Sequence, residues 1–315
     1  MGRQPHRHGT GAPVSAAVPM VSLVPGGVSL SAISAGVWRM GEWRLEVPAR
    51  VRWIEQVLEL GISSFDHADI YGGYTVESLF GEALATTPGL RERLQIVTKC
   101  GIKVVSGERP AHTIKSYDAS RAHVVASVEA SLRALRTDRI DLLLMHRPDL
   151  LMDPEELAAT FEHLRAAGKV LAFGVSNHTP PQVAMLRRRH PLVTHQIEFS
   201  PLQLQALSDG TLDQCTDLAL RPMIWSPLGG GRLFASQDEQ AQRVRGVLED
   251  LGRRYGVSAA TIAYAWILRH PARPLPITGS GRIEALREAV AALDVHISAE
   301  DWYRVWQAST GHEVA

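Results

Sequence analysis

The chain has 315 residues, of which 45% are hydrophobic and 21% are charged, a composition that is ordinary for a globular enzyme. Lysine and arginine total 33, and aspartate and glutamate also total 33, so no excess charge favours nucleic acid or an anionic membrane. We therefore expect neither a nucleic-acid partner nor a membrane partner.

Two further features concern compartment and domain organisation. No apolar run reaches the ~20 residues that a membrane span needs. The two cysteines, Cys100 and Cys215, form neither a disulfide framework nor a zinc-binding pattern, which favours a reducing compartment. We expect a cytoplasmic protein in which residues 1–17 are a disordered tail, without a signal peptide, and residues 18–315 form one domain.

The first predicted element is a short β-hairpin. Two strand-like runs, 20–23 and 28–31, flank the turn sequence Val24-Pro25-Gly26-Gly27. Buried strands and amphipathic helices then alternate along the chain. The strands are expected at 32–38, 60–65, 95–99, 139–145, 169–175, 193–199, 221–225 and 274–277. Helices are expected at 48–60, 75–84, 120–135, 153–168, 211–218, 240–255 and 258–269. Three further helices are expected: one that begins at 179, one that follows 279–281 and ends at 293, and a final one that begins at 298.

This alternation predicts an α/β fold with a parallel sheet. About eight strand–helix units without a linker favour a (β/α)8 TIM barrel, with the hairpin at its N-terminus and an extra C-terminal helix. The alternative is a doubly wound sheet, which usually carries a glycine-rich turn after its first strand. Here Gly36-Val37-Trp38-Arg39 follows the first strand and does not fit that pattern. The polar segment 100–118 is expected to be a long irregular loop.

Polar side chains follow the predicted strands one after another. In a barrel they would all face the C-terminal rim, where the active sites of such barrels lie. A single residue of this kind is more often structural, but a series at successive strand ends is not easily explained that way. The residues are Asp66, Tyr71, Lys99, His146, Ser176, Asn177, Gln196, Trp225 and Ser226.

Two kinds of site are compatible with this rim. One is a metal site of a barrel hydrolase, because imidazole and carboxylate groups suit Zn, Mn or Fe. Its candidate ligands are Asp66, His67, Asp69, His146 and Asp149. The first strand supplies no His-x-His pair for such a site, so we favour the second kind and expect no metal.

The second kind of site uses Tyr71 as a proton donor. A free phenol has a pKa of about 10, and a neighbouring ammonium group lowers that pKa by stabilising the phenolate. Lys99 could supply the ammonium group, Asp66 could hold Lys99 in an ion pair, and His146 could orient a substrate oxygen. This set contains no source of hydride, so it requires a cofactor.

These residues and their surroundings resemble the aldo-keto reductase superfamily, and in particular a bacterial oxidoreductase subgroup. Asp66, Tyr71, Lys99 and His146 match its catalytic tetrad. The resemblance extends from about Val21 to the C-terminus, through the motifs Asp66-His67-Ala68-Asp69-Ile70-Tyr71-Gly72, Ile96-Val97-Thr98-Lys99, Asp141-Leu142-Leu143-Leu144-Met145-His146, Gly174-Val175-Ser176-Asn177, Trp225-Ser226-Pro227-Leu228-Gly229-Gly230-Gly231-Arg232 and Pro276-Ile277-Thr278-Gly279-Ser280.

The resemblance implies reduction of small-molecule aldehydes and ketones, with NADPH favoured over NADH. Tyr71 would be the general acid, tuned by Lys99 and Asp66, and His146 would orient the carbonyl. The nicotinamide would be held by Ser176, Asn177 and Gln196 and would stack on Trp225. The pyrophosphate would follow Ser226, Leu228, Gly229, Gly231 and Arg232, and the adenosine 2′-phosphate would bind at Gly279, Ser280, Gly281 and Arg282.

The sequence departs from the family pattern at three places. Ala285 stands where a basic residue is common, so Arg282 or Arg287 would have to provide the charge for the 2′-phosphate. Gly73-Tyr74 replaces the usual Asn-Glu. His67 stands where threonine is common, and we favour a structural role for it. A cofactor-binding sensor barrel with little turnover remains the alternative from another class.

Overall fold

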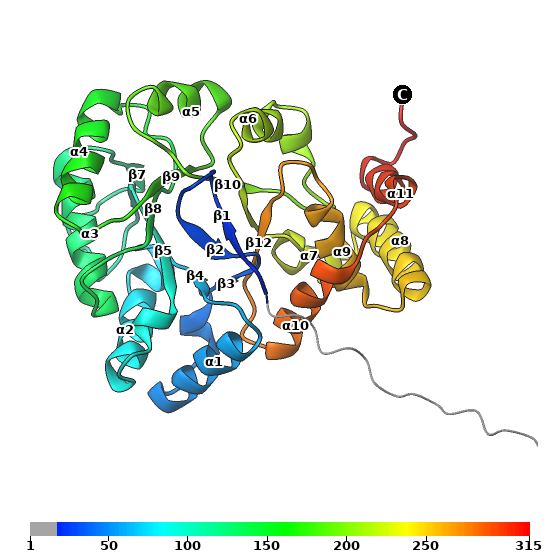
Figure 1. Ribbon diagram of the computed structural model, residues 1–315, viewed down its shortest axis with the longest axis horizontal. Helices are drawn as coiled ribbons and strands as arrows, with labels where there is room; N and C mark the ends of the chain where they lie inside the picture. Colours follow the sequence, from blue (N-terminus) through cyan, green and yellow to red (C-terminus); the bar gives the residue numbers. More distant parts are fainter. Residues whose placement is uncertain (1–17) are drawn as a thin grey trace, which may run out of the picture.

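The computed structural model describes residues 18–315, which form a closed barrel of eight parallel strands surrounded by helices (Figure 1). The expected tail, residues 1–17, lies outside the described residues. The (β/α)8 prediction is confirmed. Around the barrel the strands are β3 (Ser34–Gly36), β4 (Ser64–Asp66), β5 (Gln95–Cys100), β8 (Leu142–Met145), β9 (Phe173–Ser176), β10 (His195–Glu198), β11 (Met223–Trp225) and β12 (Leu275–Thr278).

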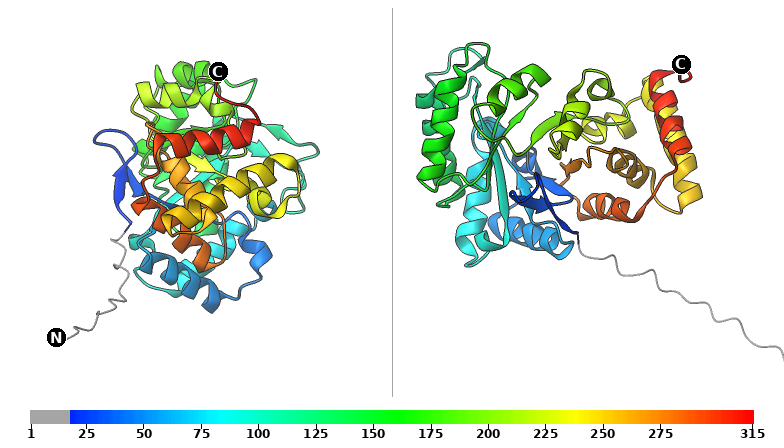
Figure 2. Two further views of the ribbon diagram at one scale, coloured as in Figure 1. Left: turned by 90° about the vertical axis from the view of Figure 1, so that its right-hand side faces the viewer. Right: turned by 45° about the horizontal axis from the view of Figure 1, so that its top comes forward.

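The barrel closes between its last and first strands. Ile277 and Thr278 of β12 pair in parallel with Ser34 and Ala35 of β3. Helices that follow the barrel strands cover the outside of the barrel, as the two further views in Figure 2 show. They are α1 (Val47–Glu59), α2 (Val76–Thr86), α3 (Arg121–Leu135), α4 (Pro154–Ala166), α5 (Pro180–Arg187), α6 (Thr211–Asp217), α7 (Arg232–Ala235), α8 (Glu239–Tyr255), α9 (Ala259–Leu268) and α10 (Ile283–Ala291).

The extra C-terminal helix is α11 (Ala299–Thr310), and it packs beside α8 (Figures 1 and 2). Its start follows from capping, because the Ser298 side chain accepts a hydrogen bond from the backbone N–H of Asp301 at 3.0 Å. Asp301 is nearly inaccessible and accepts hydrogen bonds from Arg254 of α8 at 2.8 Å and from Tyr255 at 2.8 Å. A buried carboxylate therefore joins the two helices.

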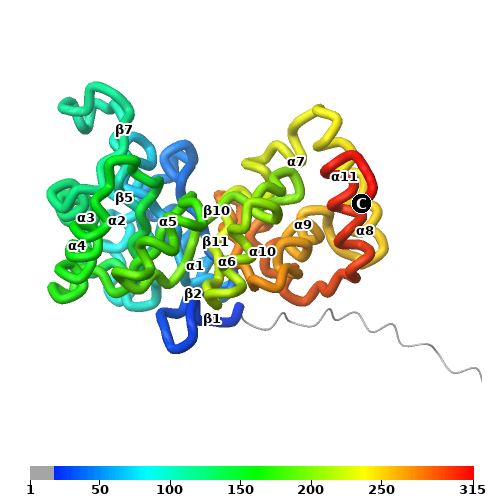
Figure 3. The backbone as a smooth tube through the Cα atoms, turned by 90° about the horizontal axis from the view of Figure 1, so that it is seen from above, coloured from blue at the N-terminus to red at the C-terminus, as the bar shows by residue number. Residues whose placement is uncertain are grey.

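The predicted hairpin is also confirmed and closes one end of the barrel. It consists of β1 (Met20–Ser22) and β2 (Ser29–Ser31) in antiparallel pairing. Leu23 and Leu30 are fully buried in the cluster that fills the barrel, where they meet Val97, Leu144 and Met223. Figure 3 shows the hairpin at one end of the barrel and the loop that carries β7 at the other.

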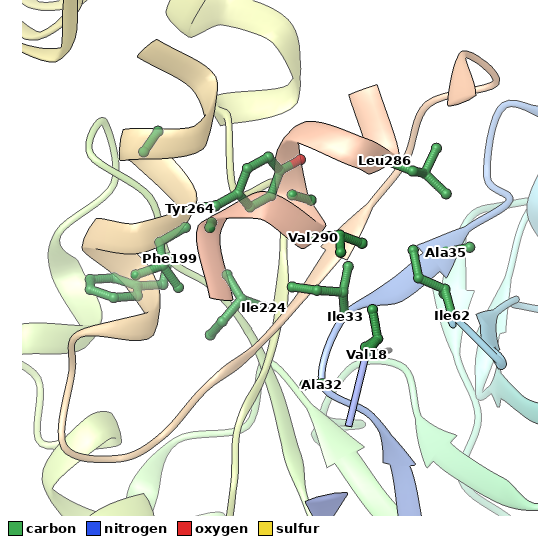
Figure 4. Packing of buried hydrophobic residues seen from close by; sticks show 14 of the residues in the cluster. Val18, Ala32, Ile33, Ala35, Ile62, Phe199, Ile224, Tyr264, Leu286 and Val290 are labelled. Atoms are coloured by element: carbon green, nitrogen blue, oxygen red, sulfur yellow. The ribbon is translucent and has the colours of Figure 1, made fainter. Parts of the chain in front are cut away.

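A second apolar layer lies between the barrel wall and the outer helices (Figure 4). Ile33 next to β3 and Ile224 of β11 meet Tyr264 of α9 and Val290 of α10 there. Each of these side chains is 6% exposed or less, so each contributes about 1.5–3 kcal/mol of burial free energy. The barrel wall is therefore packed on both faces, and it holds the strand ends rigidly.

Two local expectations are corrected by the structure. The segment after β5 is not irregular throughout, because β6 (Ile102–Lys103) and β7 (Ser116–Tyr117) form a short antiparallel pair. The sequence also predicts Thr75 as the N-cap of the helix at 75–84; Thr75 directly precedes α2, but its hydroxyl donates to the Gly72 carbonyl at 2.8 Å instead of capping the helix. In the second case a turn of the preceding chain competes for the same hydroxyl.

The close crossing of α2 and α3 gives a first prediction. A methyl group at Gly81 would lie 2.0 Å from the Ala134 carbonyl oxygen and 2.9 Å from the Leu135 Cα, and both are backbone atoms. We expect Gly81→Ala to reduce the free energy of unfolding by about 1–3 kcal/mol, measured by urea denaturation. The matched control is Gly246→Ala on α8, where nothing lies within 4 Å, and we expect it to leave stability unchanged or raise it by up to about 1 kcal/mol. Equal effects of the two variants would contradict the packing argument.

Candidate active site

Three ionisable side chains form a connected group at the C-terminal ends of β4 and β5. The Lys99 Nζ donates to Asp66 Oδ2 at 2.7 Å and lies 3.1 Å from the Tyr71 hydroxyl. The Lys99 side chain is 1% exposed and that of Asp66 is 5% exposed. Lys99 Nζ also donates to the backbone carbonyl of His67 at 2.7 Å, so this buried cation has three oxygen partners.

The strand geometry explains why these residues meet. Asp66 pairs with Val97 across β4 and β5, and β5 continues beyond that pair to Lys99. Side chains alternate along a strand, so Val97 and Lys99 point into the barrel while Thr98 points outward to Glu77 of α2. The chain after β4 stays beside β5, because the Asp69 N–H donates to the Lys99 carbonyl at 3.0 Å. A short turn, Tyr71–Gly73, then brings the phenol back over Lys99.

The pKa of Tyr71 depends on two opposing effects, burial and the neighbouring Lys99. Burial raises the pKa of the Tyr71 phenol, and Lys99 opposes that effect without cancelling it. Lys99 thus lowers the pKa of the phenol as expected, but desolvation is the larger effect, so the pKa of Tyr71 lies above its ordinary value in the protein alone. Burial acts to lower the pKa of Lys99, but Asp66 and Tyr71 together raise it above its ordinary value. The group thus holds a neutral phenol beside an ammonium cation at neutral pH.

His146 packs beside the phenol ring. It follows β8, and its backbone N–H donates to the Cys100 carbonyl at 2.9 Å. The ring centroids of His146 and Tyr71 are 6.1 Å apart, with the rings nearly perpendicular at 80°. Burial, together with Lys99 and Arg147, lowers the pKa of His146 well below its ordinary value, so the imidazole is neutral. Its Nδ1 is buried and has no hydrogen-bond partner among the described residues.

An exposed tryptophan completes the surroundings of the phenol. Trp38, in the loop after β3, is 56% exposed, and its ring centroid lies 6.4 Å from that of Tyr71. From the sequence, Trp38, Trp43 and Phe234 are all candidates for an apolar substrate pocket, and each is equally plausible as a core residue. Trp43 instead packs against Trp53 at 4.9 Å, and Phe234 is 39% exposed on α7. Of the three, the contacts place Trp38 beside the phenol.

The side chains expected at the nicotinamide form a network that reaches both His146 and Asp66. Gln196 of β10 donates to Asp66 Oδ1 at 2.8 Å. Asn177 donates to Ser176 Oγ at 2.7 Å and to the His146 carbonyl at 3.3 Å, and its amide oxygen accepts from Trp225 Nε1 at 2.9 Å. Asn177 has a φ of 58°, and this left-handed backbone turns its side chain across the strand end. The four residues are therefore part of one rim.

The glycine-rich segment after β11 runs close to the loop after β3. Gly229, Gly230 and Gly231 all have positive φ values of 61°, 65° and 98°, which few other residues would tolerate in succession. Arg39 donates to the Gly230 carbonyl at 3.2 Å. Nothing lies within 4 Å of a Cβ built on Gly231, so its backbone borders open space. The guanidinium of Arg232 is already paired with Asp238 at 2.9 Å, so its charge is partly neutralised within the protein.

The last expected cofactor segment lies between β12 and α10. The Ser280 hydroxyl accepts from the backbone N–H of Arg282 at 3.2 Å, which shapes the turn before the helix. A Cβ at Gly281 would lie 2.9 Å from the ring of Trp43, whereas one at Gly279 would meet nothing within 4 Å. Arg282 is exposed at the start of α10 and forms no ion pair with the described residues. Ser226 and Leu228 lie in the other segment, directly before the three glycines.

The side chains proposed as metal ligands lie in different surroundings. Among residues 18–315, no three His, Cys, Asp or Glu side chains are placed so that they could hold a metal ion. His67 packs edge-on against Phe80 with ring centroids 4.5 Å apart, and Asp149 accepts from the Ala119 N–H at 2.9 Å. Burial and then Glu77 raise the pKa of Asp69 well above its ordinary value.

In the part of the chain that the structure describes, no helix has the length and hydropathy needed to cross a membrane.

Comparisons with known proteins agree with this geometry. The model of the aldo/keto reductase family matches residues 32–309. The chain belongs to the aldo/keto reductase family. It is 46% identical to the oxidoreductase YdhF of Escherichia coli over 94% of this chain and 99% of that protein. It is 42% identical to the 6-dehydroglucose reductase of Agrobacterium fabrum over 91% of this chain and 97% of that protein.

The same family appears among solved structures. The glycerol dehydrogenase of Gluconobacter oxydans superposes with a TM-score of 0.80 at 26% identity, over 92% of this chain and 95% of that one. The chain is therefore an oxidoreductase that acts on carbonyl or alcohol groups, in a family that uses nicotinamide cofactors. Within this aldo/keto reductase, Asp66, Lys99 and Tyr71 form one hydrogen-bonded group, and the His146 ring lies beside the Tyr71 ring.

Sequence reasoning missed two contacts of this site. The bond between Gln196 and Asp66 joins residues 130 positions apart, and that between Arg39 and Gly230 joins residues 191 positions apart. Arg39 follows Trp38 at a strand end, so its position alone was a signal that it lies on the rim. Nothing in the sequence indicated that Gln196 would bind the carboxylate that also holds Lys99.

The neutral buried histidines give a prediction about acid. Burial lowers the pKa of His67 to about 3, so the unfolded chain takes up a proton below pH 6.5 that the folded protein does not. Stability from this group is thus complete above pH 6.5 and falls as the pH decreases toward 3. We expect His67→Leu, which breaks no hydrogen bond, to reduce the loss of unfolding free energy between pH 7 and pH 5 by about 1–2 kcal/mol.

The control for this measurement is Gly246→Ala, which removes no ionisable group and should leave the pH dependence as in the original chain. Chemical denaturation at the two pH values measures both variants. An unchanged slope for His67→Leu would show that this imidazole is charged in the folded protein.

Proposed function

We propose that this aldo/keto reductase reduces aldehyde and ketone substrates with NADPH, and that Tyr71 donates the proton to the carbonyl oxygen. The observation that carries the proposal is the neutral Tyr71 phenol held 3.1 Å from the buried Lys99 ammonium group, with the His146 ring beside it. A protonated phenol is the form that a general acid needs. When bound, NADPH supplies the hydride that the carbonyl carbon receives.

Each member of the group has a separate role in this proposal. Lys99 stabilises the negative charge that develops on the Tyr71 oxygen as its proton leaves. Asp66 holds Lys99 in place at 2.7 Å, and Gln196 holds Asp66 from the opposite side. The neutral His146 imidazole offers one N–H to the substrate oxygen, which orients the carbonyl toward the phenol. Trp38 covers the substrate from the solvent side.

The rim fits a dinucleotide. Trp225 offers a flat indole face for the nicotinamide, and Ser176 and Asn177 lie beside it as hydrogen-bonding groups. Open space borders the backbone of Gly231 and Gly279, so the pyrophosphate can approach the first closely and the 2′-phosphate the second. Arg282, exposed at the helix start and without an ion pair, suits the 2′-phosphate that distinguishes NADPH from NADH. Since Ala285 supplies no charge, this preference depends on Arg282.

A sugar-derived aldehyde is the first substrate class to test. The Agrobacterium fabrum relative at 42% identity is named a 6-dehydroglucose reductase. We propose that 6-dehydroglucose or a similar aldehyde is reduced at this site, and a panel of aliphatic, aromatic and sugar aldehydes would rank it. A barrel that only senses cofactor would bind NADPH without consuming it in any member of that panel.

The role of Tyr71 is tested by removing its hydroxyl. We expect Tyr71→Phe to lower kcat for aldehyde reduction by about 100- to 10,000-fold, because proton donation is lost, while NADPH affinity stays within about threefold. Lys99→Met should also lower kcat, since the phenol loses the cation that lowers its pKa and Asp66 loses its partner. Stopped-flow absorbance of NADPH measures the rate, and cofactor fluorescence measures the affinity. Near-normal turnover by Tyr71→Phe would overturn the proposed role.

The role of Arg282 is tested by comparing cofactors. We expect Arg282→Ala to raise the KM for NADPH by about tenfold and to leave the KM for NADH within about twofold. Arg287→Ala is the matched control, because Arg287 lies one helical turn further and pairs with Glu284 at 3.8 Å. If Arg287→Ala produced the larger change, the 2′-phosphate would bind at Arg287 instead.

A further inference from the structure

The loop between β5 and α3 rises from the rim that carries the candidate active site. Figure 3 shows the part around β7 projecting from the rest of the molecule. The β6–β7 pairing holds only the base of this loop, at residues 102–103 and 116–117. Between them lie exposed apolar side chains, with Val105 63% exposed and Ile114 69% exposed. Inside the loop the structure adds a bridge between Ser106 and Arg109, which does not join the loop to the rest of the protein, so its position depends on outside contacts.

Those outside contacts converge on Tyr74. Its hydroxyl accepts from the backbone N–H of Val104 at 3.1 Å and lies 3.3 Å from His112 Nδ1. His112 Nδ1 is also 3.2 Å from the Val104 carbonyl. The Arg109 guanidinium lies 4.7 Å from the centroid of the Tyr74 ring, a cation–π contact. Three separate positions of the loop thus meet one side chain.

The backbone at Tyr74 is adapted to this contact. Gly72, Gly73 and Tyr74 have φ values of 60°, 67° and 79°, and only the third of them carries a side chain. A tyrosine in the left-handed region costs free energy that surrounding contacts must offset. A second contact lies next to it, since the Ser106 hydroxyl donates to the Gly73 carbonyl at 2.9 Å. We call Tyr74, Ser106 and His112 the loop clasp.

The loop clasp connects directly to the Tyr71 turn. The Tyr74 N–H donates to the Tyr71 carbonyl at 3.2 Å, so the two tyrosines belong to the same short turn. From these contacts we propose that Tyr74 is a positioning residue, which fixes loop 101–118 as a wall of the substrate site and thereby selects carbonyl substrates large enough to contact it. A small aldehyde needs only Tyr71 and His146, whereas a larger one also requires a fixed wall. This inference rests on the proposed reduction at Tyr71 for its kinetic test.

The test compares Tyr74→Phe with Tyr117→Phe on the same loop. Tyr117 is 41% exposed, so its hydroxyl serves as the control. Hydrogen–deuterium exchange reports on the wall without any turnover, and we expect Tyr74→Phe to speed exchange of the Val104 amide at least tenfold, because its acceptor is removed. Tyr117→Phe should leave that amide unchanged. Equal exchange in the two variants would overturn the loop clasp whether or not the protein is a reductase.

Steady-state kinetics then test selection. With 4-nitrobenzaldehyde, Tyr74→Phe should raise KM about three- to tenfold, and with propanal both kcat and KM should stay within about twofold. Ser106→Ala, which removes the second contact, should shift the same KM in the same direction. An equal fall of kcat for both aldehydes would overturn the proposal, since it would mean that Tyr74 supports the phenol and not the wall. Absence of turnover by the unaltered protein would refute the proposed reduction, while the exchange result would still decide the clasp.

Discussion

The ion pair between Lys99 and Asp66 is the interaction on which the rest of the site depends. Both side chains are almost completely removed from water, and an unpaired charge at such a depth costs several kcal/mol. Each charge is therefore tolerated only because the other is present, together with the His67 carbonyl and the Gln196 amide. The pair joins β4 to β5 inside the barrel, and Gln196 extends it to β10. The hydrogen bonds that stabilise these buried charges are therefore the same bonds that hold the candidate catalytic side chains in place.

The pair also explains the charges of its neighbours. Burial alone would keep the Tyr71 phenol protonated, and the ammonium group moderates that effect without reversing it. The same cation adds to the effect of burial on His146 and keeps that imidazole neutral. The proton donor and the neutral hydrogen-bond donor thus lie beside each other, and the same cation acts on the pKa of both. The protonated phenol and the neutral imidazole are both present without any change in the surrounding fold.

The architecture could be predicted from the sequence because its signals are local. Alternating apolar runs indicate the strands, and residues such as Asp153, Ser258 and Ser298 cap the helices that follow them. The candidate tetrad could be predicted because each member stands at a strand end. The sequence did not indicate that desolvation outweighs Lys99 at the phenol, since that balance depends on how deeply the finished barrel buries both groups. Contacts such as Gln196 with Asp66 depend in the same way on the register of distant strands.

The closure of the barrel has a consequence for protein synthesis. The first strand, β3, ends at Gly36, and the strand that seals it, β12, begins at Leu275. Nearly the whole chain must therefore be synthesised before the barrel can close. Until then, one edge of β3 has no strand to pair with. Arg39 follows β3 and Gly230 follows β11, so their hydrogen bond can form only afterwards. A chain that stopped short of β12 would keep the Lys99–Asp66 half of the site but would lack the closed rim above it.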